Sequence, residues 1–424
     1  MTTHTSSAGA RRALQMAALI IAGEAIFGLP FIIARIFRPT LLDVFGITNL
    51  ELGTAFSLYG IVAMIAYVPG GPLADRFSAR KLMTAALLAT AAGGLYFVQV
   101  PSLAGLTVLY GIWGCTTILL FWAALIRATR EWGGDGGQGR AFGILDGGRG
   151  LLAAVLASAS VAAFASLLPG THETASAAEK ASALTAIIWI FIGAAALAAT
   201  LVWVFVPDAE VSDRDEGRFS WSHVGLVVRN PAVWLQGLIV VTAYTGYKAI
   251  DDLGLYAQDV FGFDQVRAAE VGTVAFWVRP IAAVGAGWLG DRVGAVPAIL
   301  TAFAVMLVGD LSVALGWLQP DLPWTLFMTV AVTSAAIYGL RGLYFAIFEQ
   351  AGIAPALTGT AAGVVSLVGF TPDIFMGPLM GWCTDTYPGA LGHQYLFGVL
   401  AGFAALGLSV TVAFATYVRR RAQV

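Results

Sequence analysis

Long apolar segments follow one another along almost the whole of this 424-residue chain. A helix needs about 20 mostly apolar residues to cross the hydrocarbon core of a bilayer. Segments of this kind lie at residues 13–37, 50–71, 82–100, 104–126, 141–168, 182–206, 232–257, 268–290, 297–318, 324–348, 357–382 and 394–417. The pattern predicts an all-α integral membrane protein with twelve transmembrane helices. The first segment is too long for the core of a cleaved signal peptide, so we expect it to be retained.

The composition excludes several other classes of protein. Hydrophobic residues make up 58% of the chain and charged residues 11%, whereas soluble domains carry about 25% charged residues. A formal net charge of −2 gives no basic excess that would attract nucleic acid. Cys115 and Cys383 are far apart, and the four histidines fall outside the twelve segments. Without a nucleotide loop, a metal-ligand cluster or a catalytic triad in the sequence, we expect neither an enzyme nor a cofactor nor a metal site.

Lysine and arginine distribute unevenly between the predicted loops. If the N-terminus is cytoplasmic, the cytoplasmic segments hold 15 of these residues, and the other side holds Arg38, Lys180 and Arg267. Because positive charge is retained in the cytoplasm, both termini are predicted to be cytoplasmic. The protein itself is expected in the cell membrane, that is, the inner or plasma membrane.

A charged interval at residues 207–230 divides the chain into an N-terminal bundle, residues 1–206, and a C-terminal bundle, residues 231–424. The second part of this cytoplasmic linker, FSWSHVGLVVRN, has the pattern of a short amphipathic helix on the membrane surface. We expect the protein to be monomeric.

The two halves resemble each other at a nearly constant offset. Asp-Val-Phe-Gly occurs at residues 43–46 and, 216 residues later, at 259–262. GPLADR at 71–76 matches GWLGDR at 287–292 at the same offset, and GRAFG at 139–143 matches GTAAG at 359–363. Internal repeats of this kind are typical of secondary transporters, whose substrate binds near the midplane between the halves.

The segment GGPLADRFSARK at residues 70–81 resembles the signature loop of the major facilitator superfamily, Gly-x-Leu-Ala-Asp-Arg-x-Gly-Arg-Lys. Residues 287–296 resemble the degenerate second copy of that loop. Ser78 and Ala79 depart from the usual Gly-Arg, but Arg80 and Lys81 keep the positive charge. TPDIF at 371–375, followed by GPLMG, is similar to a YihN-like bacterial branch of the superfamily. The resemblance implies two six-helix bundles that expose a central site alternately to either side.

The resemblance also implies a gating role for Gly71, Asp75, Arg76 and Arg80 in the first loop, and for Asp291 and Arg292 in the second. The alternative is that these charges only fix the topology. A further gate is expected from the repeat, because Arg35 and Asp251 are 216 residues apart. An Arg35–Asp251 pair, or the equivalent Arg38–Asp252 pair, would latch the outer ends of the first helices of the two halves.

Ionisable residues inside the predicted spans are the candidate site. Each charge at the bilayer centre costs about 2.5–3.5 kcal/mol on insertion scales and usually marks function. Glu24 and Arg279 fall at the middle of their segments. The predicted substrate-binding residues are Arg279, Lys248, Tyr244, Tyr247, Arg341 and Phe31. Glu24 and Asp373 are the candidates for proton coupling.

Each of these residues also has a structural interpretation. Lys248 has the spacing for a local pair with Asp251 or Asp252, and Arg35 has the position to snorkel to the headgroups. Arg341 is either a substrate ligand or an interface anchor. Arg279 has no acid three or four residues away, so a structural partner for it would have to come from another helix, such as Glu24.

The residues favour a secondary active transporter that moves a small, carboxylate-like organic anion by alternating access, either proton-coupled or as an exchanger. Multidrug efflux is an alternative, although the fifth segment lacks the Gly-Pro motif common in such antiporters. A non-transporting membrane sensor is the alternative of another class. The expected partners are the lipid bilayer and a small solute.

Overall fold

The computed structural model describes residues 3–134, 137–168, 175–208, 221–347, 353 and 357–421, and these residues are helical apart from short connections. No strand occurs within those ranges. The all-α membrane architecture predicted from the sequence is therefore confirmed.

The helices of the first half are α1 (Thr3–Phe27), η1 (Gly28–Ile32), α2 (Ile33–Ile36), α3 (Arg38–Phe45), α4 (Asn49–Arg76), α5 (Ala79–Phe97), α6 (Leu103–Gly114), η2 (Cys115–Trp122), α7 (Ala123–Gly133), α8 (Gln138–Leu167) and α9 (Ala177–Phe205). α10 (Trp221–Val228) follows and lies within the expected linker. It confirms the short helix predicted there, whereas residues 209–220 lie outside the described part of the chain.

The second half contains α11 (Pro231–Ala249), η4 (Ile250–Asp252), α12 (Leu253–Phe261), α13 (Gln265–Val293), α14 (Ala295–Ala314), α15 (Pro323–Leu343), α16 (Thr358–Gly369), α17 (Pro372–Thr386) and α18 (Ala390–Arg421). Each of the twelve expected spans falls on helical residues. Nine helical stretches of the described chain are long and apolar enough to cross a membrane. Three expected spans are not among these nine stretches, namely those on α5, on α11 with α12, and on α13. The count of twelve therefore stays a prediction.

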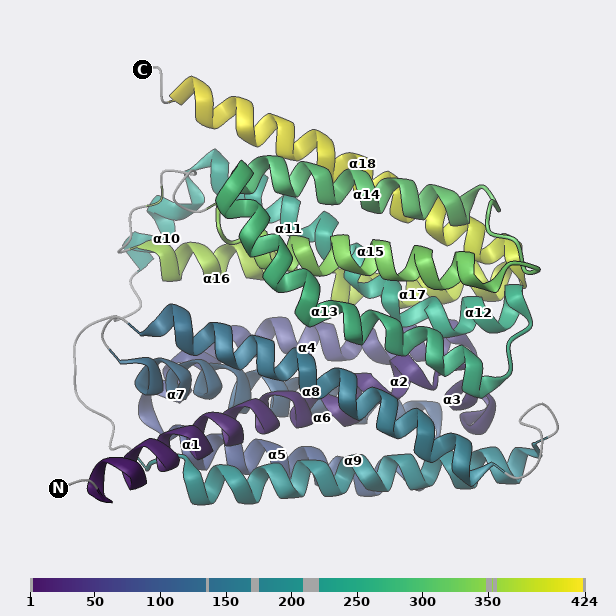
Figure 1. Ribbon diagram of the computed structural model, residues 1–424, viewed down its shortest axis with the longest axis horizontal. Coiled ribbons are helices and arrows are strands. Elements are labelled where there is room, and N and C mark those ends of the chain that lie inside the picture. The colour runs from purple at the N-terminus through teal and green to yellow at the C-terminus, as the bar shows by residue number, and fades with distance from the viewer. Residues whose placement is uncertain are drawn as a thin grey trace.

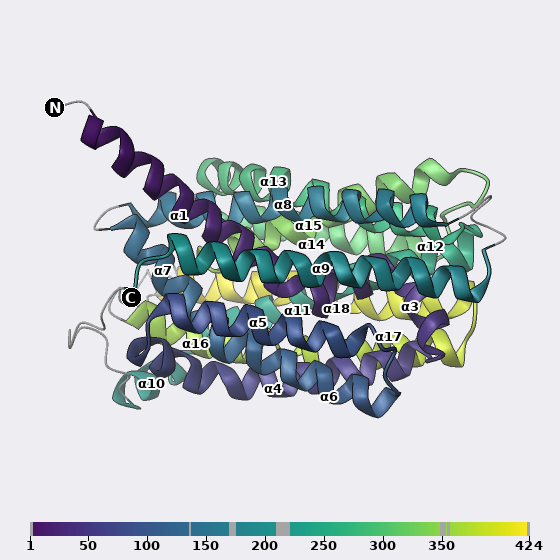
Figure 2. The ribbon, with the colours of Figure 1, turned by 90° about the horizontal axis from the view of Figure 1, so that it is seen from below.

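The two halves form adjacent bundles whose helices run along the long axis of the molecule (Figure 1). α1 begins and α18 ends at the same end of the bundle, in both views (Figures 1 and 2). We call this end the terminal face and the other end the opposite face. One buried apolar cluster consists only of residues between Val227 and Phe414, and another only of residues between Met16 and Val206. A third cluster combines residues of the first half with Val266, Ala269 and Phe276 of α13, so the halves also share apolar contacts.

Several spans are interrupted near their middle. η1 is a π-helical segment that contains Gly28 and Pro30, and Pro30 has no amide hydrogen for the regular helical ladder. η4 breaks the seventh expected span at Asp251 and Asp252. The eleventh changes direction at Phe370 and Thr371, before Pro372. Interrupted helices free backbone groups and re-aim side chains, and transporters place their binding sites at such breaks.

The halves touch mainly toward the opposite face. Thr40 is hydrogen-bonded to Gln265 at 2.6 Å, and the amide of Leu50 donates to Asp385 at 2.7 Å. α4 also packs closely on α17, where the backbones of Gly53 and Gly377 approach so nearly that neither position has room for a Cβ atom. This contact holds α4 and α17 together toward the opposite face.

Candidate functional site

A row of four charges, three of them buried and Asp373 partly buried, joins the halves near the breaks in α1–α2 and α11–α12. Arg35 of α2 donates from Nε to Oδ1 of Asp251 at 2.5 Å. Lys248 of α11 contacts the other oxygen of Asp251 at 2.9 Å and Asp373 of α17 at 3.5 Å. Two cations and two carboxylates thus alternate along this row, and their charges balance.

The Arg35–Asp251 pair expected from the repeat is formed. Lys248 makes the local pair with Asp251, which was its structural interpretation, but it also reaches Asp373. Arg35 does not snorkel to a headgroup, because its side chain is buried. The second expected pair is not formed: Arg38 donates to Asn49 at 2.7 Å, and Asp252 contacts His393 instead.

Aromatic rings surround this row of charged side chains. The Tyr247 hydroxyl accepts a hydrogen bond from Arg35 at 3.1 Å, and the Tyr244 hydroxyl donates to Asp373 at 3.1 Å. Phe31 lies beneath the Lys248 ammonium, whose nitrogen is 5.3 Å from the ring centroid. These predicted substrate-site residues therefore come together, and the rings supply both apolar and hydrogen-bonding surface.

Arg341 lies on the other side of Tyr247. Its guanidinium carbon is 4.0 Å from the centroid of the Tyr247 ring and 5.9 Å from that of Tyr244. Within the described part of the chain, no carboxylate forms an ion pair with Arg341. A guanidinium stacked on a ring keeps its edge free for an anion.

A second ionic cluster lies beside the first. Glu24 of α1 contacts Arg279 of α13 at 3.5 Å and Arg149 of α8 at 3.5 Å. Arg149 also donates to the carbonyl of Gly23 at 3.0 Å. Arg279 is therefore paired across helices with Glu24, the partner that its structural interpretation named.

Arg149 is a member of this cluster that the sequence analysis did not include among the candidate site residues. Its spacing of three residues from Asp146 suggests a local pair, and that contact exists at 3.6 Å. The Asp146 side chain is 72% exposed, however, whereas Arg149 is buried. Gly23 makes room for Arg149, because a Cβ atom there would lie 2.9 Å from the arginine side chain. The glycine directly before the buried Glu24 was the available signal.

The structure also shows a buried histidine that the sequence placed outside the spans. His393 lies in the first turns of α18 and is fully buried. Its Nδ1 is 2.8 Å from Asp252 and its Nε2 is 3.0 Å from Asp259. Ionised carboxylates only accept hydrogen bonds, so this geometry suits an imidazolium that donates from both nitrogens. The cluster ties α18 to α12 and η4 at the opposite face.

The gating residues predicted in the two loops at residues 70–81 and 287–296 lie at the terminal face. Asp75 and Arg76 occupy the exposed end of α4, and Asp291 and Arg292 the exposed end of α13. Asp75 forms no ion pair with any described residue. Gly71 is not required for close packing, because a Cβ atom would meet nothing within 4 Å.

Arg80 has a partner that the sequence did not suggest. It contacts Asp208 at 2.6 Å, just after α9, and its guanidinium carbon is 4.9 Å from the Trp203 ring. Arg80 thereby joins α5 to the end of α9 within one half.

The sequence model of the Major Facilitator Superfamily matches residues 19–375. The chain belongs to this superfamily. The matched residues include the two loops at residues 70–81 and 287–296. The protein is thus a multi-pass membrane transporter of the superfamily and not an enzyme.

Two curated bacterial relatives cover almost the whole chain. The inner membrane protein YqcE of Escherichia coli is 26% identical over 422 residues, which are 97% of this chain and 96% of YqcE. The inner membrane protein YihN of the same organism is 23% identical over 414 residues, 95% of each chain. The branch suggested by residues 371–381 is therefore confirmed.

Solved transporters share the fold. The nucleoside transporter NupG superimposes with a TM-score of 0.75 at 14% identity, over 95% of this chain and 99% of NupG. A bacterial homologue of the human lysosomal transporter Spinster, solved inward-facing and unoccupied, superimposes with a TM-score of 0.68 at 15% identity, over 96% and 95% of the two chains. At these identities the likeness establishes the superfamily fold alone.

Proposed function

We propose that this superfamily member is a secondary active transporter of a small organic anion, and that Arg279 and Arg341 bind the anion. The observation that carries the proposal is the charge of the second cluster. Arg149 and Arg279 share the carboxylate of Glu24, and among the described residues no other buried carboxylate forms an ion pair with Arg149, Arg279 or Arg341. Buried positive charge in excess is costly unless an anion occupies the site.

The chemistry of the two arginines supports a carboxylate or a similar planar anion. A guanidinium presents a fork of donors that matches two oxygens at once. The Arg279 side chain is 19% exposed, so part of its edge is accessible. Tyr247 and Tyr244 provide hydroxyls and rings for the rest of a small solute. The first cluster is balanced and is better suited to holding the two halves together.

The contacts between the halves support alternating access. With both termini in the cytoplasm, as the lysine and arginine count predicts, a protein closed at the opposite face is open to the cytoplasm. The Arg35–Asp251 pair then holds the outer gate shut, and Asp75 is free because its gate is open. In the outward-open state we expect the Arg35–Asp251 pair to break and the segments near Asp75 and Asp291 to approach each other.

Glu24 offers a route to proton coupling. Its carboxylate occupies Arg279, so a substrate carboxylate competes with it for the same guanidinium. Protonation removes that competition, because a neutral carboxyl no longer pairs with Arg279. Proton and anion would then bind together. Asp373 is the second candidate, and its release from Lys248 and Tyr244 would loosen the first cluster.

Counterflow of radiolabelled organic anions in proteoliposomes tests the proposal. A panel of monocarboxylates, dicarboxylates and phosphate esters is loaded inside, and exchange is measured in wild type, Arg341→Gln and Arg279→Gln. We expect exchange of at least one anion, with a loss of about tenfold or more in apparent affinity in both variants, since a charge-assisted hydrogen bond contributes about 1.5–3 kcal/mol. Arg267→Gln, at the opposite face, is the control.

Three outcomes contradict this proposal. Exchange of neutral or cationic drugs in preference to anions would support efflux instead. Unchanged anion affinity in Arg279→Gln and Arg341→Gln would assign both arginines a structural role. Absence of any exchange, combined with tight anion binding, would support a membrane sensor.

A further inference from the structure

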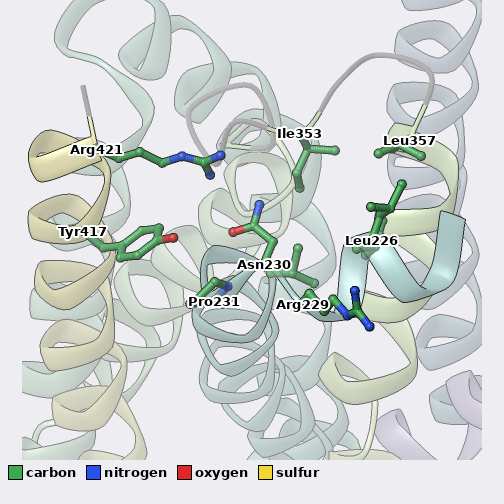
Figure 3. Close-up of a pocket in the computed structure, with 10 residues that line it drawn as sticks. Leu226, Arg229, Asn230, Pro231, Ile353, Leu357, Tyr417 and Arg421 are labelled. Carbon is green, nitrogen blue, oxygen red and sulfur yellow. The ribbon is translucent and has the colours of Figure 1, made fainter. Parts of the chain in front are cut away.

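A pocket at the terminal face lies away from the central clusters. Its volume is about 350 Å³, and it is bounded by α10, the start of α11, the end of α18 and the residues that precede α16. Figure 3 shows the Tyr417 hydroxyl pointing toward Asn230, and the Arg421 side chain extending toward Ile353. The lining residues are Leu226, Val227, Arg229, Asn230, Pro231, Val233, Ile353, Leu357, Tyr417 and Arg421.

The lining combines two kinds of chemistry. Two arginines are present and no acidic residue is among the ten, so the pocket attracts an anion. Six of the ten are apolar, and Leu226 is 58% exposed. A small inorganic anion would make no favourable contact with the apolar side of the pocket. An amphiphile with an anionic head and an acyl chain satisfies both parts.

The pocket is held in shape by the turn between α10 and α11. The Asn230 side-chain oxygen caps α11 by accepting from the backbone amide of Ala232 at 3.1 Å. The backbone amide of Asn230 donates to the carbonyl of Val227 at 3.1 Å. The Trp234 indole donates to the carbonyl of Val228 at 2.7 Å, which fixes α10 against α11. These bonds place Arg229 and Leu226 at the rim without help from a ligand.

The position in the fold points to a lipid of the bilayer. The pocket lies where α18 ends and α11 begins, so it is at the level of the headgroups. Basic pockets between spanning helices bind the head groups of anionic lipids, and short amphipathic helices such as α10 lie in the same interface. Leu226, Val228 and Trp234 expose apolar surface on α10 and α11, along which an acyl chain can lie.

We propose that this pocket binds an anionic phospholipid, with Arg421 and Arg229 on the phosphate and the apolar wall on the chain. The site adjoins the linker between the halves, and it is independent of the substrate proposed above.

Lipid binding to the purified full chain in nanodiscs tests this proposal. Retention of phosphatidylglycerol and of phosphatidylcholine is measured by native mass spectrometry in wild type, Arg421→Gln, Arg229→Gln and the double variant. We expect selective retention of phosphatidylglycerol that falls about fivefold for each arginine removed. Arg419→Gln lies on the same helix end outside the pocket and is the matched control; it should retain the lipid.

Three results would overturn the proposal. Equal losses in Arg419→Gln and Arg421→Gln would mean that only the overall charge of the helix end matters. Displacement of the lipid by millimolar inorganic phosphate would indicate a soluble anion as the ligand. Undiminished retention in the double variant would place the lipid elsewhere. Leu226→Asn supplies a second reading, because it keeps both charges and is expected to weaken lipid retention while leaving phosphate binding unaffected.

Discussion

Arg35 and Asp251 are 216 residues apart and form a buried ion pair at 2.5 Å. The same offset relates the two copies of Asp-Val-Phe-Gly and of the signature loop. The pair therefore joins equivalent positions of the two repeats, on the first helices of the two halves. Such a contact sits where those helices converge, which is the place from which a gate can hold one end of the transporter closed.

Neutralising both members of this pair is expected to do less damage than neutralising one. Asp251→Asn leaves the buried Arg35 without a carboxylate partner, which costs about 3–5 kcal/mol. Arg35→Gln should cost less, because Asp251 keeps Lys248. The double variant removes both charges, and Lys248 keeps Asp373. Transport in proteoliposomes, with thermal unfolding as the companion measurement, completes the double-mutant cycle. A double variant no better than the worse single one would argue against a direct functional pair.

A charge reversal is a less suitable test of the same pair. Asp251→Arg places a second cation beside Lys248, which now lies 2.9 Å from the carboxylate. We expect Arg35→Asp with Asp251→Arg to recover only part of the activity, and more when Lys248→Gln is added. Transport measured in the triple variant checks this, and failure of Lys248→Gln to help would show that Lys248 does not act on residue 251.

Glu24→Gln is expected to strengthen anion binding at a fixed pH. The Glu24 carboxylate contacts Arg279 at 3.5 Å and competes with the substrate for that guanidinium, whereas the neutral amide does not. Binding is followed by scintillation proximity with the labelled anion found by counterflow. Asp373→Asn is the comparison, because its carboxylate contacts Lys248 instead of Arg279. An equal gain of affinity in both variants would leave Glu24 without a special role.

His393→Gln is expected to destabilise the protein. The change leaves Asp252 buried without a charged partner, a loss of about 3–5 kcal/mol. Adding Asp252→Asn should restore part of the melting temperature, because the uncompensated charge is gone. Asp259→Asn should cost less, since that side chain is 28% exposed. Melting in detergent measures all three, and equal effects of the Asp252 and Asp259 changes would contradict the importance of burial.

The orientation is tested by labelling single cysteines with an impermeant maleimide in a background that lacks Cys115 and Cys383. Ser102→Cys and Pro320→Cys lie in exposed connections at the opposite face and should be labelled from outside the cell. Phe77→Cys, exposed between α4 and α5, should react only after the membrane is opened. Reversed labelling would overturn the orientation drawn from the lysine and arginine count.

The sequence by itself determined that this is an all-α membrane protein, that its two halves are repeats of each other, and which superfamily it resembles. Apolar length and charge asymmetry are properties of the chain that do not depend on how its helices pack, so they can be read before any contact is known. The offset of 216 residues pointed to Arg35 and Asp251 for the same reason, because symmetry of the sequence is inherited by the fold.

Only the tertiary structure decided which charges pair. Glu24 and Arg35 fall on one face of a regular helix by their spacing, but the π-helical segment at Gly28–Ile32 lies between them. Glu24 contacts α8 and α13, while Arg35 contacts η4. Helical periodicity sees neighbours three or four residues away, whereas partners such as Arg149 and His393 are brought in by helices more than a hundred residues distant. Burial and long-range pairing are set by packing, and packing is what the sequence pattern leaves open.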